Sequence, residues 1–389
     1  MTEFFPFENL TSPEVADLPR YTPLIIPLGE GYPLNQLAEA LGSPPRCGLL
    51  PAIPFGWQGS GLWVPEAVLQ NVVSNLLRSL RDDGFSSVYV LTPQNLTTGT
   101  SPIDLGAGQL ALPHPSQLSP ETALPPDDNQ EKTILIPIGH TEQHAFHLPL
   151  STDTDIVAAI CESAAQRELE RAYSLPVFPY GVSTHRAAFP GTLNVGGRAF
   201  EDFWLAAVDT LVTRGFDRFY LISGHGGNCS FLTNVIKYAG ERHRRIFCAT
   251  TWLYLSGPEG VEAIQKHRRS GRGGMGHAGE LETALMLCLK PELVHMDRVV
   301  DETNFVTTPS YYMDWVEGGA LNANPPWEDD SATGAYGAGS LATAENGALW
   351  LEAAIAEKIA HVAEIHEQQA RREARRNEGF GKWGQKAAS

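Results

Sequence analysis

From residue 131 onward, short runs rich in apolar residues alternate with longer amphipathic stretches. Runs typical of buried parallel strands fall at residues 133–139, 175–181, 216–223 and 245–255. Stretches with helical periodicity fall at about 153–169, 198–215, 229–243 and 277–289. This alternation predicts βαβ units, and therefore an α/β layered fold with a mostly parallel sheet flanked by helices. Ligand sites in such sheets lie beyond the carboxyl ends of the strands.

Polar and turn-forming residues divide the chain into segments. Residues 99–130 are rich in Pro, Ser, Gly and Asp and have no strand or helix periodicity, so we interpret them as a long linker or a surface excursion. They separate residues 1–98 from a larger region, 131–370, which carries the candidate chemistry. Residues 371–389 are predicted to form a charged C-terminal tail. An aromatic-rich insert near 304–339 is interpreted either as a lid or pocket wall or as an oligomer contact.

The first region repeats the order of motifs in the second. "TPLIIPLGEGYPLN" resembles "TILIPIGHTEQHAFHLPL", "LPAIPFG" resembles "LPVFPYG", and Gly84-Phe85 aligns with Gly215-Phe216. Polar candidates of the second region are replaced in the first, where Tyr32, Leu34 and Gln94 stand in place of Glu142, His144 and His225. We therefore interpret residues 1–98 as a degenerate, metal-free half-copy, which either extends the sheet or occupies a surface where oligomers pair. The alternative is two unrelated βα units with a similar strand and helix pattern.

Composition narrows the class of partners. The formal net charge of −17 argues against nucleic acid or an anionic membrane as the main partner. No apolar run is long enough to span a bilayer, and the N-terminus has no targeting signal. The five cysteines are scattered without a CxxC pair, which favours reduced thiols and hence a cytoplasmic protein.

The stretch "HTEQHAFHLPLSTDTD" follows directly after the run at 133–139 and concentrates the candidate metal ligands. Glu142 and His144 alternate along an extended segment, so their side chains leave the same face. Asp153 returns after a short loop. Carboxylate and imidazole ligands together suit Zn²⁺, Mn²⁺ or Fe²⁺, and a carboxylate can bridge two ions. The alternative is a polar loop that is exposed to solvent.

Three further motifs add candidates. "SGHGGN" presents His225 at the end of an apolar run, where glycines allow a sharp turn; the alternative is an ordinary Gly-rich turn. "GHAGELETALML" contains His277, a candidate proton donor or acceptor, and Glu280 and Glu282, which also suit the first turn of a helix. "GVSTHRAAFPGTLNV" is interpreted as a substrate-facing loop or a simple Pro-Gly turn.

The order of these motifs resembles that of the creatininase (creatinine amidohydrolase) family. The resemblance covers roughly residues 133–289 and rests on "EQHAFHLPLSTD", "GVSTHRAAFPGTL", "GHGGN" and "HAGELETALML". Members of this family use a metal centre, often binuclear, to hydrolyse cyclic or linear amides. The resemblance implies the family's layered α/β fold and one or two divalent ions per subunit.

The resemblance also implies roles for individual residues. The implied metal ligands are Glu142, His144, Asp153 (bridging two ions), His225 and Glu282, and the implied catalytic residues are His277 and Glu282. The expected substrate-binding residues are Ser183, His185, Thr192, Asn228 and Trp315. Two positions depart from creatininase itself: its turn carries a glutamate where this chain has Gly227, and "RSGRGGMGH" lacks the tryptophan that precedes the catalytic histidine. These departures point away from creatinine as the substrate.

Together these observations predict a metal-dependent hydrolase. The expected reaction is cleavage of a C–N amide bond in a cyclic amide, a small linear amide or a formamide by a metal-activated water. One alternative is a metallopeptidase-like enzyme that trims a modified peptide in a biosynthetic pathway. Another is a non-catalytic assembly or regulatory protein, suggested by the degenerate first half. The expected partners are a small amide or peptide substrate and further copies of the chain in a homo-oligomer.

Overall fold

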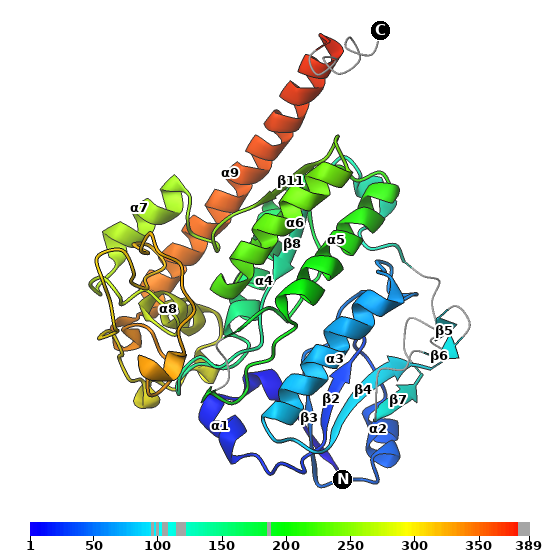
Figure 1. The fold of residues 1–389 in the computed structure, drawn as a ribbon, viewed down its shortest axis with the longest axis vertical. Helices are drawn as coiled ribbons and strands as arrows, with labels where there is room; N and C mark the ends of the chain where they lie inside the picture. The colour runs from blue at the N-terminus through cyan, green and yellow to red at the C-terminus, as the bar shows by residue number, and fades with distance from the viewer. Residues whose placement is uncertain (95–96, 99–100, 103–107, 114–121, 185–187, 380–389) are drawn as a thin grey trace.

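The computed structural model describes residues 1–94, 97–98, 101–102, 108–113, 122–184 and 188–379 (Figure 1). Two parallel sheets with their helices form the body of the molecule, and one long helix projects from it. The sheet of the second region has the order β11-β10-β8-β9 and is parallel throughout. Its strands are β8 (Thr133–Ile138), β9 (Ala172–Ser174), β10 (Arg218–Ser223) and β11 (Phe247–Thr250). The α/β fold with a parallel sheet flanked by helices is therefore confirmed.

Helices cover both faces of this sheet, because its strands are apolar on both sides. Ile134 and Ile136 of β8 belong to one core cluster with α5 (Gly197–Thr213) and α6 (Cys229–Arg242). The intervening Leu135 points the other way and packs in a cluster with α4 (Thr152–Arg167) and α9 (Ala344–Asn377). Successive strand residues point to opposite faces, so a continuous apolar run is what a sheet buried between two helical layers requires.

The first region forms a sheet of its own, with the order β1-β3-β2-β4-β7. Its strands are β1 (Glu3–Pro6), β2 (Leu24–Pro27), β3 (Arg46–Leu49), β4 (Val88–Pro93) and β7 (Gln109–Leu112), and its helices are α1 (Ser12–Asp17), α2 (Leu34–Ala40) and α3 (Glu66–Asp82). Two-residue strands β5 (Thr97–Thr98) and β6 (Ser101–Pro102) pair with each other. The expectation that this region extends the sheet of the second region is thus wrong, since the described strands pair in separate sheets.

The two sheets match in strand order and in register. The order β3-β2-β4 corresponds to β9-β8-β10, with Pro27 opposite Leu91 in the first and Pro137 opposite Ile222 in the second. Helices α3 and α5 both end in a positive-φ glycine, followed by a phenylalanine whose N–H donates to a carbonyl five residues earlier. These correspondences favour an internal repeat over two unrelated units, although the division of the chain into domains stays a prediction.

One hydrophobic core joins the two regions. Phe55 of the first region is fully buried, and its ring lies 5.8 Å from that of Phe178 and 6.2 Å from that of Phe203 in the second. Helix α3 packs against α5, as Figure 1 shows. Each region therefore covers apolar surface that the other would otherwise expose to water.

Three predicted elements differ in extent. The strand predicted at 175–181 is only a bridge at Phe178, and β9 lies just before it, because Pro176 and Pro179 have no N–H to donate to a ladder. The strand predicted at 245–255 is limited to β11, after which residues 252–255 form a bend. Within the predicted linker, Gln109–Leu112 pairs with β4 as strand β7.

The remaining elements are helices outside the two sheets. They are α7 (Pro258–His267), α8 (Glu280–Leu289) and short 3-10 helices at Phe7–Asn9, Asp127–Asn129, Gly226–Asn228, Pro291–Leu293, Met296–Arg298, Trp327–Asp329 and Gly339–Leu341. Helix α9 continues to Asn377 and projects beyond the body (Figure 1). The first residues of the predicted tail, from 371 onward, are therefore helical. None of the helices in the described part of the chain has the length and hydrophobicity needed to cross a bilayer.

Candidate metal centre

The candidate ligands meet where β8 and β10 end. Glu142 and His144 follow β8, Asp153 lies in the first turn of α4, His225 follows β10, and Glu282 lies in the first turn of α8. After β8 the chain adds β9 on one side of that strand and then β10 on its other side. The direction of strand order therefore reverses between β8 and β10, which is the topological switch point of the sheet. Parallel sheets bind ligands at such points. All five residues are nearly or fully buried.

Asp153 is at the centre of the group. Its Oδ1 lies 3.2 Å from His144 Nε2, and its Oδ2 lies 3.3 Å from His225 Nδ1. The two oxygens thus face two different imidazoles. Glu282 Oε2 lies 3.8 Å from His144 Nε2, on the same side as Oδ1. The ligand atoms of His144, Asp153 and Glu282 all lie within 4.8 Å of one another, which is close enough for one ion.

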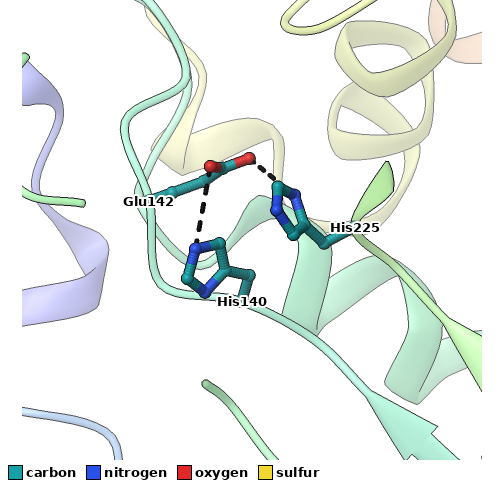
Figure 2. A group of neighbouring side chains, drawn as sticks. All are labelled: His140, Glu142 and His225. Atoms are coloured by element: carbon teal, nitrogen blue, oxygen red, sulfur yellow. Dashed lines mark ion pairs between the residues drawn. The ribbon is translucent and has the colours of Figure 1, made fainter. Parts of the chain in front are cut away.

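Glu142 contacts a histidine with each carboxylate oxygen. Its Oε1 lies 2.9 Å from His225 Nδ1, and its Oε2 lies 3.7 Å from His140 Nε2. Figure 2 shows the two rings approaching the carboxylate from different sides. The backbone N–H of Gly181 donates to His140 Nδ1 at 2.8 Å, so His140 carries its proton on Nε2, facing Glu142. At 3.7 Å the contact between His140 and Glu142 is electrostatic and too long for a hydrogen bond.

Backbone carbonyls determine which nitrogen of each candidate ligand is free. His225 Nε2 lies 2.9 Å from the carbonyl oxygen of Val182, and His144 Nδ1 lies 3.1 Å from that of Glu142. A carbonyl only accepts, so both of these nitrogens carry hydrogen. The opposite nitrogens, His225 Nδ1 and His144 Nε2, then face carboxylates. Metal-bound histidines are typically held in this way by a hydrogen bond from the other ring nitrogen.

The buried carboxylates call for compensating positive charge. Within the described residues, the one polar atom placed to donate to both Glu142 Oε1 and Asp153 Oδ2 is His225 Nδ1, at 2.9 and 3.3 Å. Burial alone lowers the pKa of His144, but Asp153 and Glu282 outweigh it and raise that pKa to about 9. Burial raises the pKa of Glu282 to about 7. Protons or divalent cations can supply the missing charge, and metal binding to such groups displaces protons. The residues therefore fit one or two divalent ions.

The structure separates Glu282 from Glu280. The Glu280 carboxylate accepts hydrogen bonds from the backbone N–H groups of Arg269 and Ser270, away from the other candidates. Glu282 turns toward His144 instead, and its Oε2 accepts from the N–H of Ala278 at 2.6 Å. Residues two positions apart on a helix are rotated by about 200° around its axis, so only one of Glu280 and Glu282 can face the centre.

His277 lies beside the candidate ligands as a neutral base. Its Nε2 donates to the carbonyl oxygen of Gln143 at 2.7 Å, which leaves Nδ1 free, 3.5 Å from Glu142 Oε1. Burial, together with the charge of His144, lowers the pKa of His277 to about 3. Sequence reasoning missed Gln143, because nothing in "TEQHAF" indicates that its carbonyl positions a ring 134 residues away.

Two alanines beside the centre adopt the left-handed conformation. Ala145, which follows His144, has φ of 55°, and Ala278, which follows His277, has φ of 50°. Non-glycine residues adopt this conformation at a cost and tend to do so at functional sites. Here the turn at Ala278 brings its N–H to Glu282.

The predicted substrate-binding residues have different surroundings. The hydroxyl of Thr192 accepts from the N–H of Gln143, and the amide of Asn228 bonds to Val182, Gly139 and Ser223, so both support the backbone of the centre. Ser183 is buried beside Val182. His185 lies outside the described residues. The predicted contact of these residues with substrate stays a prediction.

The aromatic insert forms a wall of a cavity of about 460 Å³ that opens onto the centre. Trp315 donates to Glu282 Oε1 at 3.3 Å, and the Trp327 ring lies 4.9 Å from that of His277. Trp252, which sequence reasoning missed, faces Trp315 with ring centres 6.0 Å apart. The interpretation of the insert as a pocket wall is therefore the one that the structure favours.

Comparison with known proteins decides the family. The sequence profile of the family described as creatinine amidohydrolase matches residues 120–362. The chain belongs to the creatininase family. It is 28% identical to creatinine amidohydrolase of Pseudomonas putida over 190 residues, which are 46% of this chain and 72% of that one. It is 32% identical to mycofactocin precursor peptide peptidase of Mycobacterium ulcerans over 174 residues, 43% of this chain and 62% of that one.

The fold of the chain is similar to solved structures of creatininase. A mutant creatininase complexed with creatine aligns with a TM-score of 0.52 and 26% identity, covering 62% of this chain and 94% of that chain. A manganese creatininase aligns with a TM-score of 0.51 and the same identity, covering 61% and 92%. The predicted family and fold are confirmed.

Proposed function

We propose that the chain is a metal-dependent hydrolase that cleaves a C–N amide bond. The observation that carries the proposal is the pair of imidazole nitrogens, His144 Nε2 and His225 Nδ1, that face the two oxygens of Asp153. The other nitrogen of each ring donates to a backbone carbonyl, so these two nitrogens are the ones that would bind a metal ion once they lose their protons. Membership of the creatininase family supports the same reaction class.

The proposed ligands fall into two groups that share Asp153. Glu142 and His225 lie on the side of Oδ2, and His144 and Glu282 lie on the side of Oδ1. This division supports two divalent ions of zinc, manganese or iron, which these residues would hold with Asp153 contributing to both groups. When bound, such ions lower the pKa of water and polarise a carbonyl group. The protein supplies positioning, exclusion of water and proton transfer.

His277 is the proposed proton carrier. Its Nδ1 is unprotonated and faces the centre, so it can accept a proton as the nucleophile attacks the carbonyl. The hydrogen bond from Nε2 to Gln143 holds the ring in this tautomer and stabilises the imidazolium that forms. Nδ1 can then donate the proton to the departing nitrogen, which an amide needs in order to leave. Glu282 sits within reach of the same space and is the second proposed catalytic residue.

The proposed substrate is a cyclic amide, a small linear amide or a formamide. A second candidate, trimming of a modified peptide, is supported by the 30–32% identity to mycofactocin precursor peptide peptidases of several mycobacteria. The cavity that Trp315 and Trp327 help to line, of about 460 Å³, falls in the range of sites that bind ligands larger than a single small ring. Both candidates use the same bond cleavage and differ in what lies on either side of it.

We further propose that the first region is a metal-free half-copy. At the position of Glu142 it has Tyr32, whose hydroxyl donates to the carbonyl of Leu28 at 2.6 Å. Its packing through Phe55 supports a structural role. Formation of a homo-oligomer is also proposed, and light scattering on the purified protein tests it.

Metal content tests the proposed centre directly. The protein is purified as wild type, Glu142→Gln and Asp153→Asn, and bound metal is measured by mass spectrometry beside turnover of an amide and formamide panel. Asp155→Asn is the matched control, since this carboxylate lies in the same helical turn but pairs with Lys290 at 2.7 Å. We expect about two ions in the wild type and the control, and loss of metal and activity in the two ligand variants. A wild type without metal would refute the proposal.

A further inference from the structure

The aromatic insert hydrogen-bonds to a candidate metal ligand. The indole N–H of Trp315 donates to Glu282 Oε1 at 3.3 Å, while the backbone N–H of Ala278 donates to Glu282 Oε2 at 2.6 Å. Oε2 is also the oxygen that lies 3.8 Å from His144 Nε2. Each carboxylate oxygen therefore has one donor, and one of the two donors comes from a segment that contains none of the proposed ligands.

These two hydrogen bonds determine how the Glu282 carboxylate is oriented. The last side-chain torsion of glutamate has a broad energy profile, so the side chain by itself does not fix the plane of the carboxylate. Glu282 is only 3% exposed, so water cannot readily replace a missing donor. A buried carboxylate oxygen without a donor is costly, and the group would turn toward another one. The Trp315 hydrogen bond therefore keeps Oε2, rather than Oε1, turned toward His144.

The backbone at Trp315 is held by the preceding residue, Asp314, whose side chain is buried. Asp314 Oδ1 accepts from the N–H of Val316 at 3.0 Å, within the insert. Asp314 Oδ2 accepts from the N–H of Gly273 at 2.8 Å and from the Arg268 guanidinium at 3.1 Å. This carboxylate therefore ties the insert to the segment that leads into α8, the helix that carries the candidate ligand.

Further contacts hold the Trp315 ring itself. The Trp252 ring meets it at an angle of 62°, with ring centres 6.0 Å apart. A Cβ atom at Gly226 would lie 3.3 Å from the Trp315 ring, so the turn after β10 approaches the indole closely. The backbone N–H of Trp315 donates to the carbonyl of Met275 at 3.4 Å. The indole is therefore directed toward Glu282 by the fold, before any ion binds.

We propose that Trp315 is a positioning residue of the metal centre, which holds the Glu282 carboxylate so that Oε2 faces His144. Asp314 supports this role by holding Trp315 in place. The inference rests on the proposed function, because it takes Glu282 as a metal ligand. It makes the aromatic insert a part of metal binding as well as a wall of the cavity.

Removal of the indole N–H tests the role of Trp315. Trp315→Phe keeps an aromatic ring that cannot donate, and Trp252→Phe is the matched control on the neighbouring ring. Chelator competition measures the affinity for Zn²⁺, and thermal unfolding of the metal-free protein reports whether each variant folds. We expect one of the two ions to bind about 10- to 100-fold more weakly in Trp315→Phe, because Glu282 belongs to one ligand group only. Both affinities should stay at the wild-type value in Trp252→Phe.

Asp314→Asn tests the same link without changing the ring. Asparagine has one acceptor oxygen instead of two, so hydrogen bonds to the insert or to the segment before α8 are lost. The same ion should bind more weakly, with no further loss when Trp315→Phe is added. Unchanged Zn²⁺ affinity in Trp315→Phe, or in Asp314→Asn if the first variant does not fold, overturns the inference and leaves the proposed function intact. Equal weakening of both ions also overturns the inference alone, whereas a wild type that binds no metal overturns both.

Discussion

Introducing a glutamate at position 227 should weaken metal binding in this protein. A Cβ at residue 227 would lie 2.3 Å from His225 Nε2 and 2.4 Å from the carbonyl oxygen of Val182. These are the two atoms of the 2.9 Å hydrogen bond that fixes the His225 tautomer. Either the histidine or the carbonyl must move, and the hydrogen bond breaks in both cases.

The size of the effect follows from the role of that hydrogen bond. Loss of a bond that orients a ligating histidine typically lowers metal affinity by about 10- to 100-fold. This factor corresponds to about 1.4–2.7 kcal/mol of binding free energy. The added carboxylate cannot recover it, because its own Cβ is what displaces the ring. We therefore expect Gly227→Glu to bind metal at least about tenfold more weakly than the wild type.

Competition with a chelator of known affinity measures this loss, with metal content by mass spectrometry as a second readout. Gly240→Glu introduces the same side chain at an open position of α6 and controls for the added charge. Metal affinity in Gly227→Glu equal to or above that of the wild type would show that the Val182–His225 contact does not hold the ligand.

Three further predictions concern the base, the shared core and the buried carboxyl group of Glu8. His277→Gln should lower kcat by about 10²- to 10⁴-fold without changing the metal content. Steady-state turnover assays measure kcat and mass spectrometry measures the metal. An unchanged kcat would contradict the role of His277 as the base. Phe55→Ala should reduce the free energy of unfolding in urea by about 3–5 kcal/mol, because Phe55 is fully buried between the two regions; a loss under about 1 kcal/mol would mean that the regions fold separately. Burial raises the pKa of Glu8 from 4.5 to about 7, so the folded state binds the proton more tightly than the unfolded state. Stability should therefore fall as pH rises from about 4.5 to about 7, by up to about 3 kcal/mol, and Glu8→Gln should remove this part of the pH dependence in thermal unfolding; an identical pH profile in the variant would contradict the assignment.

Local sequence patterns predicted the fold class and the proximity of several candidate ligands. Continuous apolar runs, the helical stretches between them and the turn glycines are properties of neighbouring residues, so they can be interpreted without a structure. The alternation of Glu142 and His144 after an apolar run is likewise a local pattern that the sequence alone reveals. The strand at 175–181 failed because its prolines, visible in the sequence, outweigh its hydrophobicity.

Contacts between distant segments could not be predicted in this way. The tautomers of His144 and His225 depend on where two carbonyls lie, and the carbonyl of Val182 comes 43 residues before His225. The shared core through Phe55 depends on how the two regions pack, which their separate patterns leave open.

The sequence by itself determined the parallel α/β architecture and the residue types of a metal centre at the end of β8, because both follow from short-range periodicity and ligand chemistry. Only the tertiary structure decided that Glu282 rather than Glu280 faces the centre, because helix rotation relative to His144 is set by packing. It alone placed the Trp315 indole beside Glu282, since these residues are 33 positions apart and meet only in the folded chain.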